Sequence, residues 1–258
     1  MDELRNTQFS YTGNYAHPEL HGEKSINDHM TDILLGVIPP NGNLLDVGCG
    51  AANKIIPIAA AGITVIGIDV STGLLSEAQQ NIQESGLENI TIKQGNTDQL
   101  PIEDGSVDCV SYMLAPHNTV EAYRVLKPGG YAIRERVGFG DKDNIKRPFQ
   151  NVDGSPRGYQ GEIPSEEALK IMLTEDFARA GFIDIKFEVI EIETFYTPDG
   201  LRKLLKETPT VKDYDEVKDK SIVDELINSQ MNSEGKIRTI QRRLILIARK
   251  PEQSEQIE

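Results

Sequence analysis

The sequence has little cysteine and no long apolar run. Its 258 residues contain two cysteines, Cys49 and Cys109, which have neither the spacing of a metal site nor the number of a disulfide framework. We expect no bound metal and two reduced packing residues. No apolar run approaches the ~20 residues that cross a bilayer, and the first residues, Met1 to Asn6, include no hydrophobic signal segment. These absences predict a cytoplasmic chain.

Positive charge is also scarce. Lys and Arg number 27 against 41 Asp and Glu, which gives a formal net charge of -14 at pH 7. Non-specific binding to nucleic acid or to an anionic membrane depends on Lys and Arg that neutralise phosphates. We therefore expect no nucleic-acid and no membrane partner, and a small-molecule or protein partner is favoured. One small basic group, Lys142, Lys146 and Arg147, is predicted to lie on a solvated loop.

The length and the 38% hydrophobic content suit one substantial core. We expect the main domain at residues 23–250 and a disordered tail at 251–258. Residues 1–22 are rich in aromatic and histidine rings, so they form either an arm packed on the domain or a lid over a ligand. The polar, mostly helical segment 197–239 is expected to lie off the main sheet as an insertion.

The most informative stretch is Leu44 to Asn53, which reads Leu-Leu-Asp-Val-Gly-Cys-Gly-Ala-Ala-Asn. Its first residues, 44–47, predict a short buried strand, and Gly48 and Gly50 permit a tight turn that a ligand can approach closely. Residues 51–61 predict a helix whose first N–H groups point into the turn. The stretch is therefore a candidate nucleotide site.

Apolar patterns along the rest of the chain alternate between strands and helices. This alternation predicts an α/β fold in which a parallel sheet is flanked by helices on both faces. We expect further helices at residues 23–37, 71–86 and 165–180, and further strands at residues 64–68, 90–93, 107–113, 130–136, 182–195 and 243–249.

Asp69 lies 23 residues after Asp46 and ends the second predicted strand. A carboxylate in this place can accept two hydrogen bonds from adjacent ribose hydroxyls, although it can also serve only to stabilise the start of the next helix. Together with Asn96-Thr97 after the third strand and the turn at residues 127–130, this pattern resembles the class I S-adenosylmethionine-dependent methyltransferases.

The resemblance implies a Rossmann-like sheet that is mostly parallel, with an antiparallel last strand. The helical insertion at residues 197–239, before that strand, is expected to cover the acceptor site at the carboxyl edge of the sheet. The resemblance also implies S-adenosylmethionine as the cofactor and S-adenosylhomocysteine as its product. In this family the glycine loop holds the methionine part, the Asp69 position holds the ribose, and the Val70 position lies against the adenine. The cofactor-binding residues implied are Asp46, Gly48, Cys49, Gly50, Asp69, Val70, Asn96, Thr97 and Met113.

Two further stretches, Leu100 to Asp108 and Arg124 to Gly130, are similar to methyltransferases that act on small metabolites. The Asn-Pro-Pro-Tyr motif of many nucleic-acid and protein-glutamine methyltransferases is absent, since the place after the fourth strand reads Tyr112-Met113-Leu114-Ala115. We therefore expect methyl transfer to an oxygen, a carbon or a simple amine of a small-molecule acceptor.

Residues just beyond the fourth and fifth strands are expected to face that acceptor. His117 is the candidate general base or orienting donor, because a histidine titrates near neutrality, but Pro-His-Asn is also an ordinary turn sequence. Glu135 and Arg136 are candidate acceptor contacts, or they pair with each other at a strand end. Tyr15 and His17 are the corresponding candidates in the N-terminal segment.

Three other classes of protein share parts of this pattern. An NAD-dependent dehydrogenase would need glycine at position 53, where this chain has Asn53. A nucleic-acid methyltransferase conflicts with the acidic balance. A catalytically silent protein that binds S-adenosylmethionine, as a sensor or a partner subunit, keeps the same binding residues and is distinguished only by a test of methyl transfer.

Overall fold

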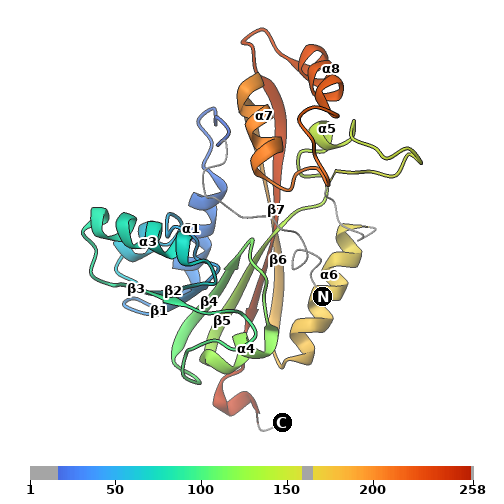
Figure 1. Cartoon of the computed structure of the whole chain (residues 1–258). Coiled ribbons are helices and arrows are strands. Elements are labelled where there is room, and N and C mark those ends of the chain that lie inside the picture. Colours follow the sequence, from blue (N-terminus) through green and yellow to red (C-terminus); the bar gives the residue numbers. More distant parts are fainter. Residues whose placement is uncertain (1–16, 159–164, 257–258) are drawn as a thin grey trace.

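The runs predicted as strands form one seven-stranded sheet (Figure 1). In the computed structural model, which describes residues 17–158 and 165–256, the strand order is β3-β2-β1-β4-β5-β7-β6. Strand β7 runs antiparallel to both of its neighbours, and the other pairs are parallel. The predicted fold class is thereby confirmed. The strands are β1 (Asn43–Val47), β2 (Thr64–Asp69), β3 (Ile90–Gln94), β4 (Val107–Met113), β5 (Leu126–Val137), β6 (Ile183–Tyr196) and β7 (Ile237–Arg249).

Helices cover both faces of the sheet, because side chains point alternately to its two sides and both sides are apolar. One face carries α1 (Ile26–Val37), α2 (Ile56–Ala60) and α3 (Thr72–Ser85), and the other carries α4 (Thr119–Val125) and α6 (Glu166–Arg179). Figure 1 shows α1 and α3 on one side of the strands and α6 on the other.

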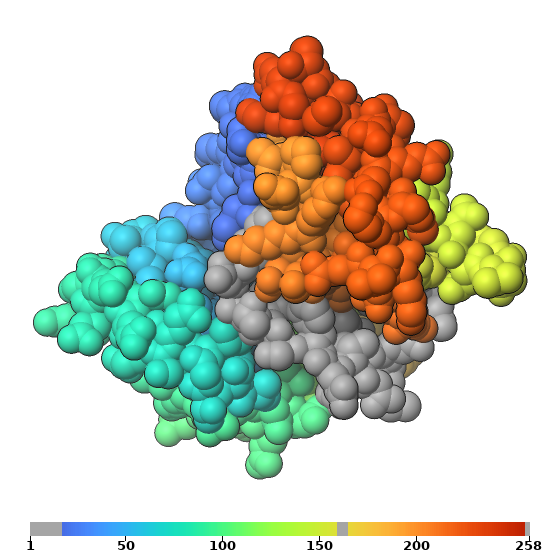
Figure 2. All heavy atoms as spheres, turned by 45° about the horizontal axis from the view of Figure 1, so that its top comes forward, coloured from blue at the N-terminus to red at the C-terminus, as the bar shows by residue number. Residues whose placement is uncertain are grey.

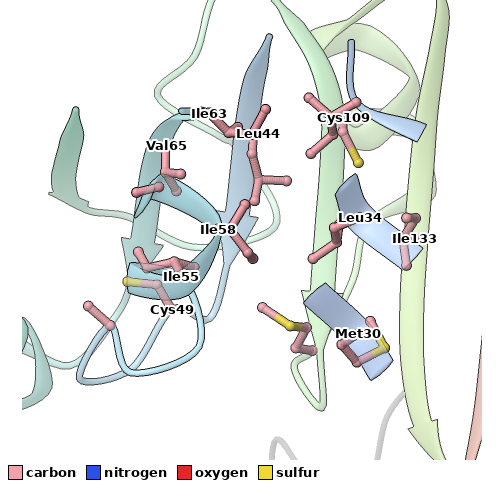
Figure 3. Packing of buried hydrophobic residues seen from close by; sticks show 14 of the residues in the cluster. Met30, Leu34, Leu44, Cys49, Ile55, Ile58, Ile63, Val65, Cys109 and Ile133 are labelled. Carbon is pink, nitrogen blue, oxygen red and sulfur yellow. The ribbon is translucent and has the colours of Figure 1, made fainter. Parts of the chain in front are cut away.

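The core under α1 is drawn in Figure 3. Met30 and Leu34 of α1 lie beside Cys109 of β4 and Ile133 of β5, while Ile58 of α2 lies toward β1. All five side chains are at most 1% exposed. Both cysteines of the chain are buried and free, as the sequence predicted.

The helix ends follow local capping rules. Ser25 and Asp28 form a reciprocal capping box at the start of α1. The Ser71 hydroxyl accepts the Leu74 N–H at the start of α3, and Gly86, with φ of 68°, ends that helix in the left-handed conformation. These boundaries were predicted from sequence and are confirmed to within a few residues.

The helix after the glycine turn is shorter than predicted. It begins at Ile56 rather than at Ala51, and residues 51–55 form successive turns. Pro57 explains the shift, because proline lacks an N–H and fits only the first turn of a helix. Ala52 also has a positive φ of 67°, which a helix does not contain. A series of turns, residues 51–55, therefore separates Gly50 from the start of α2.

Strand lengths and the C-terminal tail also differ from prediction. β5 begins at Leu126, four residues early, because the predicted turn becomes an irregularity inside the strand, with Gly129 at φ of 78°. β7 begins six residues early, at Ile237, where polar and buried residues alternate. The tail is not disordered over residues 251–256. It includes the short helix η2 (Gln253–Gln256), which is held by an ion pair between Arg249 and Glu255.

A third core lies beyond the end of the main sheet. Strands β6 and β7 continue pairing past the last β5 partner, Val137, and this two-stranded extension carries α7 (Pro198–Glu207) and α8 (Lys220–Gln230). We call residues 197–236 the cap. Its apolar side chains pack together with Ile145 of α5 (Asp143–Lys146). Figures 1 and 2 show the cap gathered at one end of the molecule.

Most of the N-terminal segment, including Tyr15, lies outside the described residues. Its last part lies along β6, where the backbones of Glu19 and Phe195 exchange two hydrogen bonds and the His21 ring stacks on Phe195 with 4.0 Å between centroids. Over the described parts of the chain, no helix combines the length and the apolar character needed to cross a membrane.

The cap core predicts a clear difference between two substitutions. Leu201→Ala removes a side chain that is 0% exposed in this core, so the free energy of unfolding should fall by ~3 kcal/mol. Val217→Ala, at a cap residue that is 84% exposed, should change it by less than ~0.5 kcal/mol. Urea denaturation measures both values. Equal effects would contradict the packing described for the cap.

Candidate functional site

The glycine turn after β1 has one closed and one open position. A Cβ at Gly48 would lie 2.4 Å from the Ala115 Cβ, so glycine is required there for packing. A Cβ at Gly50 would meet no atom of the protein within 4 Å, although its φ of 54° already favours glycine. The backbone at Gly50 is therefore exposed to whatever binds above the turn.

Asp69 joins this turn to the loop after β2. Its carboxylate accepts the Gly50 N–H through Oδ2 and the Ser71 N–H through Oδ1, both at 2.9 Å. A carboxylate offers about four lone-pair positions, so two protein donors leave room for two ligand hydroxyls. Val70, the next residue, is 64% exposed and presents an apolar surface beside the carboxylate.

Asp46 lies buried beneath the same turn. Its Oδ1 accepts the Ser111 hydroxyl at 2.6 Å, and the residue is 1% exposed. Burial raises the pKa of this carboxyl to about 6, and the Ser111 hydrogen bond opposes that rise. Asp46 therefore contacts Ser111 of β4 inside the protein and presents almost no surface to solvent.

Beyond β3, Asn96 is committed to its own turn. Its Oδ1 accepts the Asp98 N–H at 2.9 Å and the Gln99 N–H at 3.2 Å. The side chain is exposed, and Thr97 beside it is half-buried. The Asn96 side-chain oxygen is thus already used within the turn, which leaves the amide nitrogen to face a ligand.

Three residues meet where β4 and β5 end. Met113 and Glu135 are direct partners in the sheet. Lys54, which follows the glycine turn, donates to the Met113 carbonyl oxygen at 3.1 Å, and its Nζ lies 3.9 Å from Glu135 Oε2. Sequence analysis missed Lys54. The available signal was one cation in the alanine- and isoleucine-rich stretch 51–61.

The other oxygen of Glu135 belongs to a buried charge cluster. Glu135 Oε1 accepts Arg243 Nε at 3.0 Å, and Arg243 Nη1 donates to Asp141 Oδ1 at 2.8 Å. Lys142 and Lys146 also surround Asp141, with Nζ atoms at 3.2 and 3.3 Å. The prediction that these lysines lie on a solvated loop is therefore wrong, since paired charges allow burial. Only Arg147 of that group is exposed.

Burial changes the ionisation of this cluster. It lowers the pKa of Lys142 to about 8, against the opposing attraction of Asp141. Burial alone would raise the pKa of the Asp141 carboxyl, but Lys142, Arg243 and Lys146 hold it well below its usual range. The cluster therefore keeps a charged carboxylate in the protein interior directly behind Glu135.

Comparisons with known proteins match the part of the chain that carries the glycine turn and Asp69. Residues 44–130, from β1 into β5, match the methyltransferase domain family. This part of the chain is a class I S-adenosylmethionine-dependent methyltransferase domain. The cofactor of this family is S-adenosylmethionine.

Some individual relatives match a longer part of the chain than the family does. A demethylmenaquinone methyltransferase of Lactococcus lactis is 25% identical over 170 residues, which cover 57% of this chain and 68% of that protein. The chain spans slightly less than half the length of several other curated relatives that it matches.

Solved structures share the fold. The YcgJ protein of Bacillus subtilis matches with a TM-score of 0.59 and 17% identity, over 87% of this methyltransferase and 99% of that chain. The cyclase SpnF matches with a TM-score of 0.58 and 21% identity, over 93% and 88% of the two chains. At these identities the likeness concerns the fold alone.

His117 of the methyltransferase lies on the opposite face of the sheet from Glu135. Its Nε2 is 2.9 Å from Arg134 Nη1 and 3.2 Å from Asp176 Oδ2, and its ring stacks on Phe177 of α6. Arg134 and Glu135 are consecutive in β5, so their side chains point to opposite faces. The structure therefore does not bring His117 together with Lys54 and Met113.

The remaining predicted acceptor residues also separate. Arg136 is half-buried and follows Arg134 on its face of the sheet, so it does not pair with Glu135, whose partner is Arg243. His17 is exposed. Of the acceptor residues proposed from sequence, Glu135 alone lies beside Met113 among the residues that the structure describes.

The raised pKa of Asp46 predicts a pH-dependent stability. The folded chain keeps this proton up to about pH 6, whereas an unfolded chain loses it near 3.8, so the free energy of unfolding falls as the pH rises between these values. Asp46→Asn removes this fall. The variant should gain ~3 kcal/mol relative to the parent between about pH 4 and 7, measured by urea denaturation.

Ser111→Ala tests the same assignment from the other side. The lost hydroxyl no longer stabilises the charged carboxylate, so the pKa of Asp46 in the folded chain rises further and the upper end of the window in which stability falls should move to higher pH. If parent and Asp46→Asn remained parallel across the whole pH range, Asp46 would have no raised pKa.

The position of His117 predicts a structural effect on substitution. His117→Ala loses the Asp176 contact and the Phe177 stacking, so the free energy of unfolding should fall by ~1–3 kcal/mol. The affinity of His117→Ala for S-adenosylhomocysteine should stay within about twofold of the parent, because His117 shares no contact with the glycine turn or with Asp69. Parent-like stability with turnover reduced about 100-fold would instead show that His117 is the base.

Proposed function

We propose that this chain transfers the methyl group of S-adenosylmethionine to a small-molecule acceptor at the carboxyl ends of β1, β2, β4 and β5. The observation that carries this proposal is the Asp69 carboxylate, which is held by the Gly50 and Ser71 N–H groups beside the open space over Gly50. Open α/β sheets bind nucleotides at this edge, where strand order changes direction.

The proposed cofactor contacts follow the turn and the two loops beside it. The backbone of Gly48, Cys49 and Gly50 lies along the methionine part, and the spare lone pairs of Asp69 accept the ribose hydroxyls. Val70 covers one face of the adenine. Asn96 and Thr97 border the adenine edge, and Asn96 contributes its amide nitrogen because its oxygen is engaged. Met113 lies at the methyl end of the site.

When bound, the sulfonium supplies a methyl group that is already activated. The protein therefore has to align the acceptor with the methyl–sulfur bond and exclude water. We propose that the cap and residues 1–22 cover the acceptor. The cap suits this role because the β6–β7 extension holds it beyond the sheet, and His21 and Glu19 fasten the end of the N-terminal segment to the same extension.

A second candidate function is cofactor binding without methyl transfer. The fold alone does not decide between the two, because a cyclase shares it. The separation of His117 from Lys54 and Met113 is compatible with either function, since transfer of an activated methyl group does not require a histidine base. Methyl transfer from labelled S-adenosylmethionine to a panel of small hydroxyl, carbon-acid and amine acceptors distinguishes them.

Two glycine substitutions with similar backbone strain test the cofactor site. Gly50 and Gly86 both have a left-handed φ, 54° and 68°, and a Cβ at either meets no protein atom within 4 Å. Both alanine variants should therefore lose about 1 kcal/mol of stability or somewhat more. Only Gly50→Ala should weaken S-adenosylhomocysteine binding, by about tenfold or more, because its Cβ enters the ligand space.

Calorimetry with S-adenosylmethionine, S-adenosylhomocysteine and NAD measures these affinities. Heat with NAD and none with the two sulfur ligands would overturn the proposed function. Equal loss of affinity in Gly50→Ala and Gly86→Ala would show that backbone strain, and not occupation of the space over Gly50, causes the effect.

A further inference from the structure

One oxygen of Glu135 is buried without a hydrogen-bond partner in the described parts of the chain. The residue is 2% exposed; its Oε1 accepts Arg243 Nε, and its Oε2 accepts no protein donor. Lys54 Nζ lies 3.9 Å from Oε2, which is too far for a hydrogen bond. A buried carboxylate oxygen left in this way costs free energy, so a polar group that binds there is favoured.

Glu135 lies at the strand end where the acceptor is proposed to bind. Glu135 is level with Met113 at the carboxyl end of the sheet, and the two side chains lie on the face that carries the glycine turn. Lys54 connects them, since it donates to the Met113 carbonyl oxygen and approaches Glu135 Oε2. A carboxylate and an ammonium therefore lie side by side at the carboxyl ends of β4 and β5.

The charges around this pair select the kind of group that fits. A protonated amine could donate to Oε2, but it would lie beside the Lys54 ammonium and be repelled. A carbon acid offers no conventional donor to Oε2. A neutral hydroxyl meets both requirements, because its hydrogen can be donated to Glu135 while its oxygen accepts from Lys54.

We propose that Glu135 and Lys54 bind the reacting hydroxyl of an acidic acceptor, a phenol or an enol, so that the enzyme is an O-methyltransferase. This assignment rests on the proposed function and names its substrate class. Arg243 and Asp141 act as positioning residues, because they fix the Glu135 carboxylate from behind.

The proposed step balances without another reactant. The acceptor oxygen forms a bond to the methyl carbon as the carbon–sulfur bond breaks, and the bonding pair stays on sulfur, which becomes a neutral thioether. The hydroxyl proton passes to Glu135 Oε2. Lys54 stabilises the negative charge that develops on the oxygen before the methyl group arrives.

The test uses the full chain saturated with S-adenosylhomocysteine and two matched probes, para-nitrophenol and para-nitroanisole. The probes differ in the hydroxyl, which is methylated in the second, and the visible absorbance of the phenolate reports ionisation. We expect the parent to bind para-nitrophenol about tenfold more tightly than para-nitroanisole. Glu135→Gln and Lys54→Met should each abolish that preference. The ionisation of the bound phenol should move to higher pH in Lys54→Met, which loses the ammonium, and to lower pH in Glu135→Gln, which loses the carboxylate.

Glu84→Gln is the matched control. Glu84 is an exposed carboxylate near the end of α3 and belongs to neither the Glu135 nor the Lys54 contacts, so the preference for the hydroxyl should persist. If Glu135→Gln fails to fold, Lys54→Met carries the test, because Lys54 is 26% exposed and its side chain donates to a backbone carbonyl oxygen rather than to the buried charge cluster.

Three outcomes would overturn the assignment. The parent could fail to prefer para-nitrophenol, the preference could survive in Glu135→Gln and Lys54→Met, or Glu84→Gln could remove it equally. In the same samples, calorimetry shows whether S-adenosylhomocysteine binds. Binding of this product with no hydroxyl preference overturns the acceptor assignment alone, whereas loss of product binding in the parent overturns the proposed function itself.

Discussion

The position of β1 at the point where strand order reverses is the constraint on which this molecule depends. β1 pairs with β2 on one side and with β4 on the other, and both pairs are parallel. The chain leaving β1 must therefore turn toward one side while the chain leaving β4 turns toward the other, which opens a crevice at the carboxyl edge. The Asp69 carboxylate ties the β1 and β2 loops together at that crevice.

A row of polar side chains continues from this crevice across the sheet. Ser111 contacts Asp46, Glu135 contacts Arg243, and Lys54 lies between the two pairs on the same face. Such groups are costly in an apolar core unless each is paired. Their placement at the strand ends, just past the apolar layer of Cys109 and Ile133, limits that cost and gives one face of the sheet a polar margin.

Sequence predicted the parts of the site that depend on local pattern. The glycine turn, Asp69 and the Ser71 N-cap of α3 each follow from spacing within a few residues, and the fold class follows from the alternation of strands and helices. The Glu135–Arg243 pair was not predictable in this way, because its members are 108 residues apart and meet only when β7 inserts beside β5. The burial of Lys142 and Lys146 has the same cause, since Arg243 and Asp141 create the charged interior that holds them. His117 was expected to face the acceptor because it follows the end of β4. Its position in the sequence does not determine on which face of the sheet its ring packs, and the ring packs against Phe177 of α6.

The β6–β7 extension has a consequence for how this enzyme can diverge. The cap core and the two cores of the sheet have no buried residue in common, so a substitution that repacks one does not disturb the others directly. If the cap covers the acceptor as proposed, substitutions in it alter the acceptor pocket as a separate module, while the sheet that holds the glycine turn and Asp69 keeps its packing.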